Sequence, residues 1–225
     1  MTDARFVHAL ALGLDPAWRR LSAEERCRGA EELAAALATG TEVTTFSYST
    51  IGLEPGADLL LWSLAPSLDA LEERAAAVLR SAMGGWLTVR ESFLGIIQPS
   101  QYVKKPTPQE QSLFSGERSR YLIVYPFTKN TDWYLQGREA RQGVMNEHMR
   151  IGHDYPEIRQ LLANSFGIDD MDFLVAYETD DLARFGELVR ALRGTDSRRS
   201  TIRDTPLLVG IHRPIAEIAS LLGAR

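Results

Sequence analysis

The order in which strand-like and helix-like segments follow one another occurs twice along these 225 residues. In each half, a strand-like segment is followed by a helix-like segment whose apolar residues recur about 3.6 residues apart. Two further strand-like segments, a second helix and a last strand come next, over residues 6–97 and again over residues 120–211. The order β-α-β-β-α-β is that of a ferredoxin-like unit, in which helices cover one face of an antiparallel sheet. The sequence therefore predicts an α+β fold built from two such repeats.

The repeats predict how the chain divides. We expect an N-terminal repeat at residues 1–97 and a C-terminal repeat at residues 119–225, joined by residues 98–118. The connecting segment contains several prolines and shows no clear periodicity. A connection of this length inside a compact protein is more often functional than idle.

Composition excludes several classes of function. Cys27 is the only cysteine, so neither an intrachain disulfide nor a cysteine-based zinc site can form. The formal net charge of -5 makes nucleic acid and anionic lipid poor partners. The sequence shows no signal-peptide pattern and no apolar run of the length that a membrane-spanning helix needs. These features predict a cytoplasmic protein without a membrane span.

Four histidines are the main candidates for metal or acid–base chemistry. His148 lies in a helix-like segment in which Val144 and Ile151 share its face. A histidine on an apolar helix face is commonly a core residue. The alternative is a ligand for a large flat cofactor, because imidazole is the common axial ligand of haem iron. Spacing alone leaves both interpretations open. The other three histidines are expected to have structural roles: His8, His153 and His212.

Five short motifs in the second half carry a family resemblance. In chain order they are Tyr125-Pro-Phe-Thr-Lys129, Asp132-Trp-Tyr134, Met145-Asn-Glu-His148, Ser165-Phe-Gly-Ile-Asp-Asp170 and Phe173-Leu-Val-Ala-Tyr-Glu-Thr-Asp-Asp181. Together they make the chain resemble the chlorite dismutase family, which includes the coproheme decarboxylases of haem biosynthesis. The resemblance is dense over residues 121–211 and is one of layout in the first half. It implies a dimeric α+β barrel formed by both repeats of one chain, and a homo-oligomer, usually a pentamer.

The resemblance also implies a haem site in the second half. The proximal iron ligand of the family falls on His148, and the acidic residue that accepts its second N–H falls on Asp196. Other members often carry Glu there, so the shorter Asp implies a longer or weaker hydrogen bond. Tyr102, Lys104 and Lys105 fall on a loop that family members bring toward the haem propionates, although the usual arginine has no clear match here.

The residue above the iron separates the activities within this family. Chlorite dismutases carry an arginine there, whose fixed charge holds an oxyanion. The implied alignment puts Gln160 at this position, and Arg159 then points the other way because side chains alternate along a strand. A shift of one residue would restore the arginine. Gln is neutral, so it can hydrogen-bond a peroxide or a propionate but supplies no charge.

A distal Gln resembles the coproheme decarboxylases, and two more residues match that branch. Tyr125 matches their redox-active tyrosine and Lys129 matches the lysine beside it. The implied substrate is coproheme III, which is also its own redox cofactor, and hydrogen peroxide is the oxidant. A Tyr125 radical then takes hydrogen from a propionate held by Lys129 and Gln160, and haem b is formed. The alternatives are a chlorite dismutase or weak haem peroxidase of this family, a non-enzymatic haem-binding protein, and a ferredoxin-like oligomerisation module without haem.

Overall fold

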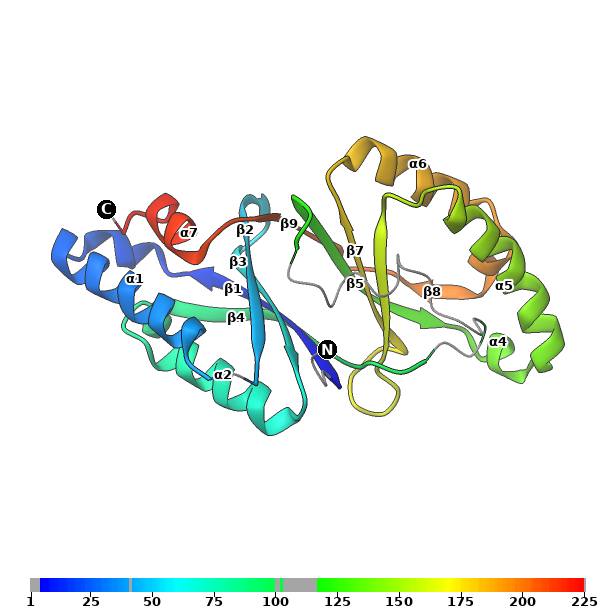
Figure 1. The fold of residues 1–225 in the computed structure, drawn as a ribbon, viewed down its shortest axis with the longest axis horizontal. Helices are drawn as coiled ribbons and strands as arrows, with labels where there is room; N and C mark the ends of the chain where they lie inside the picture. Colours follow the sequence, from blue (N-terminus) through cyan, green and yellow to red (C-terminus); the bar gives the residue numbers. More distant parts are fainter. Residues whose placement is uncertain (1–4, 41, 100–101, 103–116, 225) are drawn as a thin grey trace. The chain divides into compact units, whose positions relative to one another are not determined.

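The computed structural model describes residues 5–40, 42–99, 102 and 117–224, and the chain forms two compact units. One unit comprises Met1–Ile97 together with Val209–Arg225, and the other comprises Gln98–Leu208. In each unit, helices cover one face of antiparallel strands (Figure 1). None of the helices in the described part of the chain is long and apolar enough to cross a membrane.

The first unit contains a complete β-α-β-β-α-β repeat. Its elements are β1 (Phe6–Leu14), α1 (Ala23–Ala38), β2 (Thr44–Glu54), β3 (Ala57–Ala65), α2 (Leu68–Arg80) and β4 (Leu87–Ile96), with short 3-10 turns at Pro16–Arg20 and Gly84–Trp86. Strand β1 pairs antiparallel with both β3 and β4, and β2 pairs with the other edge of β3. The strand order β4-β1-β3-β2 is that of the ferredoxin-like sheet that the sequence predicts.

Local signals explain where these helices begin and what they cover. A capping box opens α1, because Ser22 accepts from the backbone N–H of Glu25 while the Glu25 carboxylate accepts from that of Ser22. The apolar face of α1 then packs Leu33 against Trp18 and the sheet residue Leu59, and all three side chains are fully buried. This core is confined to the first unit, so the unit supplies its own hydrophobic stabilisation.

The second unit carries the motif-bearing elements. They are β5 (Tyr121–Lys129), α4 (Thr131–Leu135), α5 (Arg138–His153), β6 (Arg159–Asn164), β7 (Phe173–Thr179), α6 (Leu182–Arg193), the 3-10 turn η4 (Asp196–Ser200) and β8 (Thr201–Arg203). Strand β7 lies between β5 and β6 and is antiparallel to both. Asp181 caps α6 by accepting from the backbone N–H groups of Ala183 and Arg184. The order of these elements agrees with the second predicted repeat as far as α6.

The last strand differs from the prediction. The sequence predicts one strand over residues 201–211, whereas the structure has β8 and a separate β9 (Leu208–His212). Pro206 lies between them and has no backbone N–H to donate to a ladder. Strand β9 pairs antiparallel with β2, and at Gly210 a Cβ atom would lie 2.6 Å from the Cβ of Tyr48, so glycine permits this close pairing.

The C-terminal segment consequently belongs with the first unit. Helix α7 (Ile215–Leu221) follows β9 and packs Ile218 into the first unit's core. Residues 209–225 therefore group with residues 1–97, which corrects the predicted C-terminal repeat of residues 119–225. Closure of the two repeats into one barrel stays a prediction.

Candidate active site

Three of the polar and aromatic side chains of interest share one face of the second unit's sheet. Tyr177 on β7 lies opposite Ile123 on β5 and opposite Gln160 on β6. Tyr125 is two residues beyond Ile123 and points to the same side, because side chains alternate along a strand. The Tyr177 ring contacts the Phe185 ring of α6 at a centroid distance of 5.2 Å. Tyr125, Tyr177 and Gln160 therefore lie on the face that the helices cover.

Arg159 lies on the opposite face of the sheet. Its register partner is Glu178, whose fully buried carboxylate Oε2 is 2.9 Å from the Arg159 Nη2. Arg159 also donates a hydrogen bond to the Ser119 hydroxyl at 3.0 Å, and Arg118 approaches Glu178 from the other side at 3.4 Å. Of the two neighbouring residues, the structure thus places Gln160, and not Arg159, on the helix-covered face.

Glu178→Gln is expected to destabilise the fold by about 3–5 kcal/mol, because removing one partner of a buried ion pair leaves the other charge uncompensated. Here the charges left are those of Arg118 and Arg159. Denaturant unfolding measures the loss in free energy of unfolding. Glu187→Gln is the matched control, since Glu187 pairs with Arg184 on an exposed helix surface and exposed pairs contribute little. Equal effects of the two variants would contradict the assigned role of Glu178.

Tyr125 is a protonated phenol in a buried setting. Its ring stacks on that of Tyr177 with centroids 6.4 Å apart and an angle of 23° between the planes, and the two hydroxyls share a hydrogen bond. Burial is the main cause that raises the pKa of Tyr125 well above its ordinary value, and Tyr177 adds to the effect. The phenol therefore keeps its proton at neutral pH, and its oxidation by one electron must also remove that proton.

His148 is a neutral imidazole with an unsatisfied nitrogen. Burial, together with the nearby Lys129 cation, lowers the pKa of His148 to about 4. Its Nδ1 is buried and has no hydrogen-bond partner among the described residues. A buried polar atom without a partner is costly. Neutral imidazole is also the form that ligates metals, so His148 fits a role as an axial ligand.

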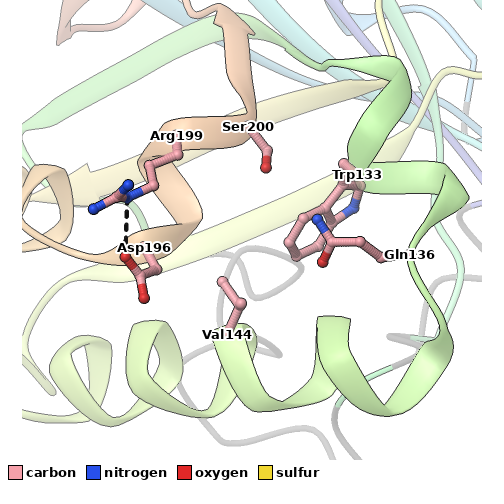
Figure 2. Close-up of a pocket in the computed structure, with 6 residues that line it drawn as sticks. All are labelled: Trp133, Gln136, Val144, Asp196, Arg199 and Ser200. Carbon is pink, nitrogen blue, oxygen red and sulfur yellow. Dashed lines mark ion pairs between the residues drawn. The ribbon is translucent and has the colours of Figure 1, made fainter.

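An open pocket of about 460 Å³ lies between α5, the α4 segment and η4. Figure 2 shows Val144 pointing into it from α5, Trp133 and Gln136 at one end, and the residues of η4 across from Val144. His148 is one helical turn beyond Val144, so it lies on the same face of α5. The described residues hold no cluster of three or more histidine, cysteine or acidic side chains that could bind a bare metal ion. The site instead fits an iron that brings its own ring of nitrogen ligands.

Asp196 is not the partner of His148 in this structure. Its exposed carboxylate pairs with the Nε of Arg199 at 3.1 Å, as the dashed line in Figure 2 shows. The predicted hydrogen bond is absent because Arg199, three residues along the same turn, takes the carboxylate and the His148 Nδ1 is left without a partner among the described residues. The sequence pattern of the turn did not reveal this competition.

Lys129 ends β5 as a buried cation. Its Nζ donates to the Ser197 carbonyl at 2.6 Å, approaches the hydroxyls of Ser197 and Thr201 at 3.3 Å, and lies 4.7 Å from the centre of the Trp133 ring. Burial is the main cause that lowers the pKa of Lys129 to about 8, so the side chain is still charged at pH 7. Within the described part of the chain it makes no ion pair with a carboxylate. Its charge is therefore available to an anionic ligand.

The connecting loop contributes little that the structure describes. The Tyr102 carbonyl is 3.5 Å from the Nε2 of Gln142, which places Tyr102 beside α5. Lys104 and Lys105 lie outside the described residues. Their predicted role at the propionates, like that of Tyr102, stays a prediction.

Comparison with known proteins decides the family. The chlorite dismutase family model matches residues 24–213. The chain belongs to the chlorite dismutase family. A coproheme decarboxylase from Mycolicibacterium smegmatis is 30% identical over 165 residues, which cover 72% of this chain and 70% of that protein. The resemblance inferred from the five motifs is thereby confirmed.

Solved structures of chlorite dismutase share the fold. A mutant chlorite dismutase from Candidatus Nitrospira defluvii matches with a TM-score of 0.90 and 28% identity, over 99% of this chain and 96% of that one. The chlorite dismutase of the same organism in complex with imidazole matches with a TM-score of 0.88 and 28% identity, over 98% and 95% of the two chains. Chlorite dismutase family members bind haem, and the unpartnered nitrogen of His148 fits that group.

Family membership leaves one residue to be found from the structure. Tyr177 lies inside the last of the five motifs, but its contact with Tyr125 depends on how β5 and β7 pair. Alternation along residues 171–178 was the available signal, since it puts Tyr177 and Val175 on one face. The pairing partner, which sets the neighbour of that face, lies about 50 residues away and is not encoded locally.

Proposed function

We propose that this chain converts coproheme III to haem b by oxidative decarboxylation with hydrogen peroxide. The observation that carries the proposal is the orientation of β6, which puts the neutral Gln160 on the face of Tyr125 and ties Arg159 to Glu178 on the other. A chlorite dismutase needs a fixed positive charge for its oxyanion. A decarboxylase needs an oxidisable group beside the propionate, and Tyr125 is such a group.

The overall reaction balances with one peroxide for each propionate. A propionate side chain loses carbon dioxide and two hydrogens, a vinyl group remains, and hydrogen peroxide is reduced to two waters. The bound iron porphyrin supplies the site at which peroxide is reduced. Tyr125 gives up its hydroxyl hydrogen and then recovers one from the β-carbon of the propionate. The reaction takes place at two propionates and yields haem b.

The remaining residues bind and orient the substrate. His148 offers a neutral imidazole toward the iron because burial holds its pKa near 4. Lys129 has neutral acceptors around its ammonium group, so a propionate carboxylate supplies the missing counter-charge. Gln160 can donate a hydrogen bond to a propionate or to peroxide without adding a charge. Charge-assisted hydrogen bonds of this kind are about twice as strong as neutral ones, which favours a defined propionate position.

The activity assay that tests this proposal compares two oxidants on one preparation. The purified chain, loaded with coproheme or with haem b, is given peroxide or chlorite, and porphyrin products and dioxygen are followed. We expect vinyl products with peroxide and little dioxygen from chlorite, because no arginine lies on the Gln160 face. Rapid and sustained dioxygen release from chlorite by the wild type would contradict the charge argument and favour the chlorite dismutase alternative.

A further inference from the structure

Tyr177 is a second buried phenol beside the one that the proposed reaction uses. Its pKa is raised by burial, while the hydrogen bond from Tyr125 acts in the opposite direction. The same hydrogen bond raises the pKa of Tyr125. These opposite effects identify Tyr125 as the donor and the Tyr177 oxygen as the acceptor when both phenols are intact.

The backbone fixes this pair. Tyr125 on β5 is the register partner of Val175 on β7, so Tyr177 is its diagonal neighbour across the two strands. Diagonal neighbours lie within reach of each other when the side chains are aromatic. The ring of Phe185 on α6 packs against Tyr177 from the helix side, at 5.2 Å and 55°. Two hydrogen-bonded strands and one helix therefore hold the two hydroxyls in contact.

Oxidation of Tyr125 reverses the direction of this hydrogen bond. A phenol that has lost one electron and its proton becomes a neutral phenoxyl, whose oxygen can only accept. The Tyr177 hydroxyl can rotate about its C–O bond and so can donate. If the hydrogen atom itself crosses, the Tyr177 O–H bond breaks and a Tyr125 O–H bond forms. The exchange leaves one phenol and one phenoxyl, so it needs no further oxidant or reductant.

We propose that Tyr177 is the positioning partner of the Tyr125 radical: it donates a hydrogen bond to the oxidised Tyr125 oxygen and exchanges its hydrogen atom with it. This inference rests on the proposed function in one respect, namely that Tyr125 is oxidised. It adds that the oxidised state is shared by two phenols. The hydrogen bond also orients the Tyr125 oxygen while it awaits the propionate hydrogen.

High-field electron paramagnetic resonance tests the hydrogen bond directly. The coproheme-loaded full chain is frozen shortly after peroxide addition, as wild type, Tyr177→Phe and Tyr121→Phe. A hydrogen bond to a phenoxyl oxygen lowers its largest g value, so we expect that value to shift upward in Tyr177→Phe. Tyr121→Phe removes another phenol from the same strand and should match the wild type. An unchanged g value in Tyr177→Phe, or a wild type without a phenoxyl signal, would overturn the proposal.

A second measurement needs neither porphyrin nor activity. The free energy of unfolding is compared for wild type, Tyr125→Phe, Tyr177→Phe and the double variant. Because both single variants lose the same hydrogen bond, the double variant should be destabilised by less than their sum. Strict additivity would overturn the contact. If the g value shifts but haem b never forms, the proposed function fails and this inference stands; haem b formation with an unchanged g value is the reverse.

Discussion

Tyr125→Phe is expected to bind coproheme and to leave it unconverted after peroxide is added. Phe keeps the ring and its stacking on Tyr177 but lacks the O–H bond that must break. The fold should survive, since the lost hydrogen bond contributes about 1 kcal/mol. Decarboxylation should fall to the level of coproheme and peroxide without protein. Chromatography of the extracted porphyrin measures this.

The control for that experiment is Tyr121→Phe. Tyr121 is on the same strand and the same face, four residues from Tyr125. It should decarboxylate like the wild type, and both variants should show the same absorption spectrum when loaded. Conversion by Tyr125→Phe at the wild-type rate would show that another residue carries the radical or that the reaction follows a different course.

His148→Ala is expected to lose the axial ligand of the bound iron. Changes to residues that merely support a metal ligand already cost about 10–100-fold in affinity, so loss of the ligand itself should cost at least about 100-fold. Titration with coproheme, followed by the Soret band, measures both the affinity and the change in ligation. The apo protein should remain folded, because Ala is the best helix former and the variant removes a nitrogen without a partner from α5.

His153→Ala is the matched control for the ligand. His153 is the last residue of α5 and is exposed, so the variant removes the same imidazole from the same helix. Its Soret band and affinity should equal those of the wild type. An unchanged spectrum in His148→Ala would mean that the iron binds elsewhere.

The parts of the fold that local patterns encode could be predicted from the sequence. The helix expected over residues 139–150 is α5 (Arg138–His153), and the capping box expected at Ser22 is formed as its spacing predicts. The failure at residues 201–211 has a tertiary cause. Strand β9 pairs with β2, more than 150 residues earlier, and no local pattern specifies that choice.

The candidate site divides in the same way. Alternation along β6 was sufficient to separate Gln160 from Arg159, and the pairing of Arg159 with Glu178 agrees with it. The partner predicted for His148 failed because a side chain on a short turn can choose between nearby groups, and Asp196 pairs with Arg199. The Tyr125–Tyr177 contact needed the strand register, which only the structure gives.

The most direct test of the central claim is the mass of the porphyrin after reaction. The full chain is loaded with coproheme, peroxide is added in steps, and the extracted porphyrin is analysed by mass spectrometry while carbon dioxide is measured. The account predicts two successive losses, each of one carbon dioxide and two hydrogens for one peroxide, which end at haem b. Peroxide consumption with coproheme of unchanged mass and no carbon dioxide would contradict it.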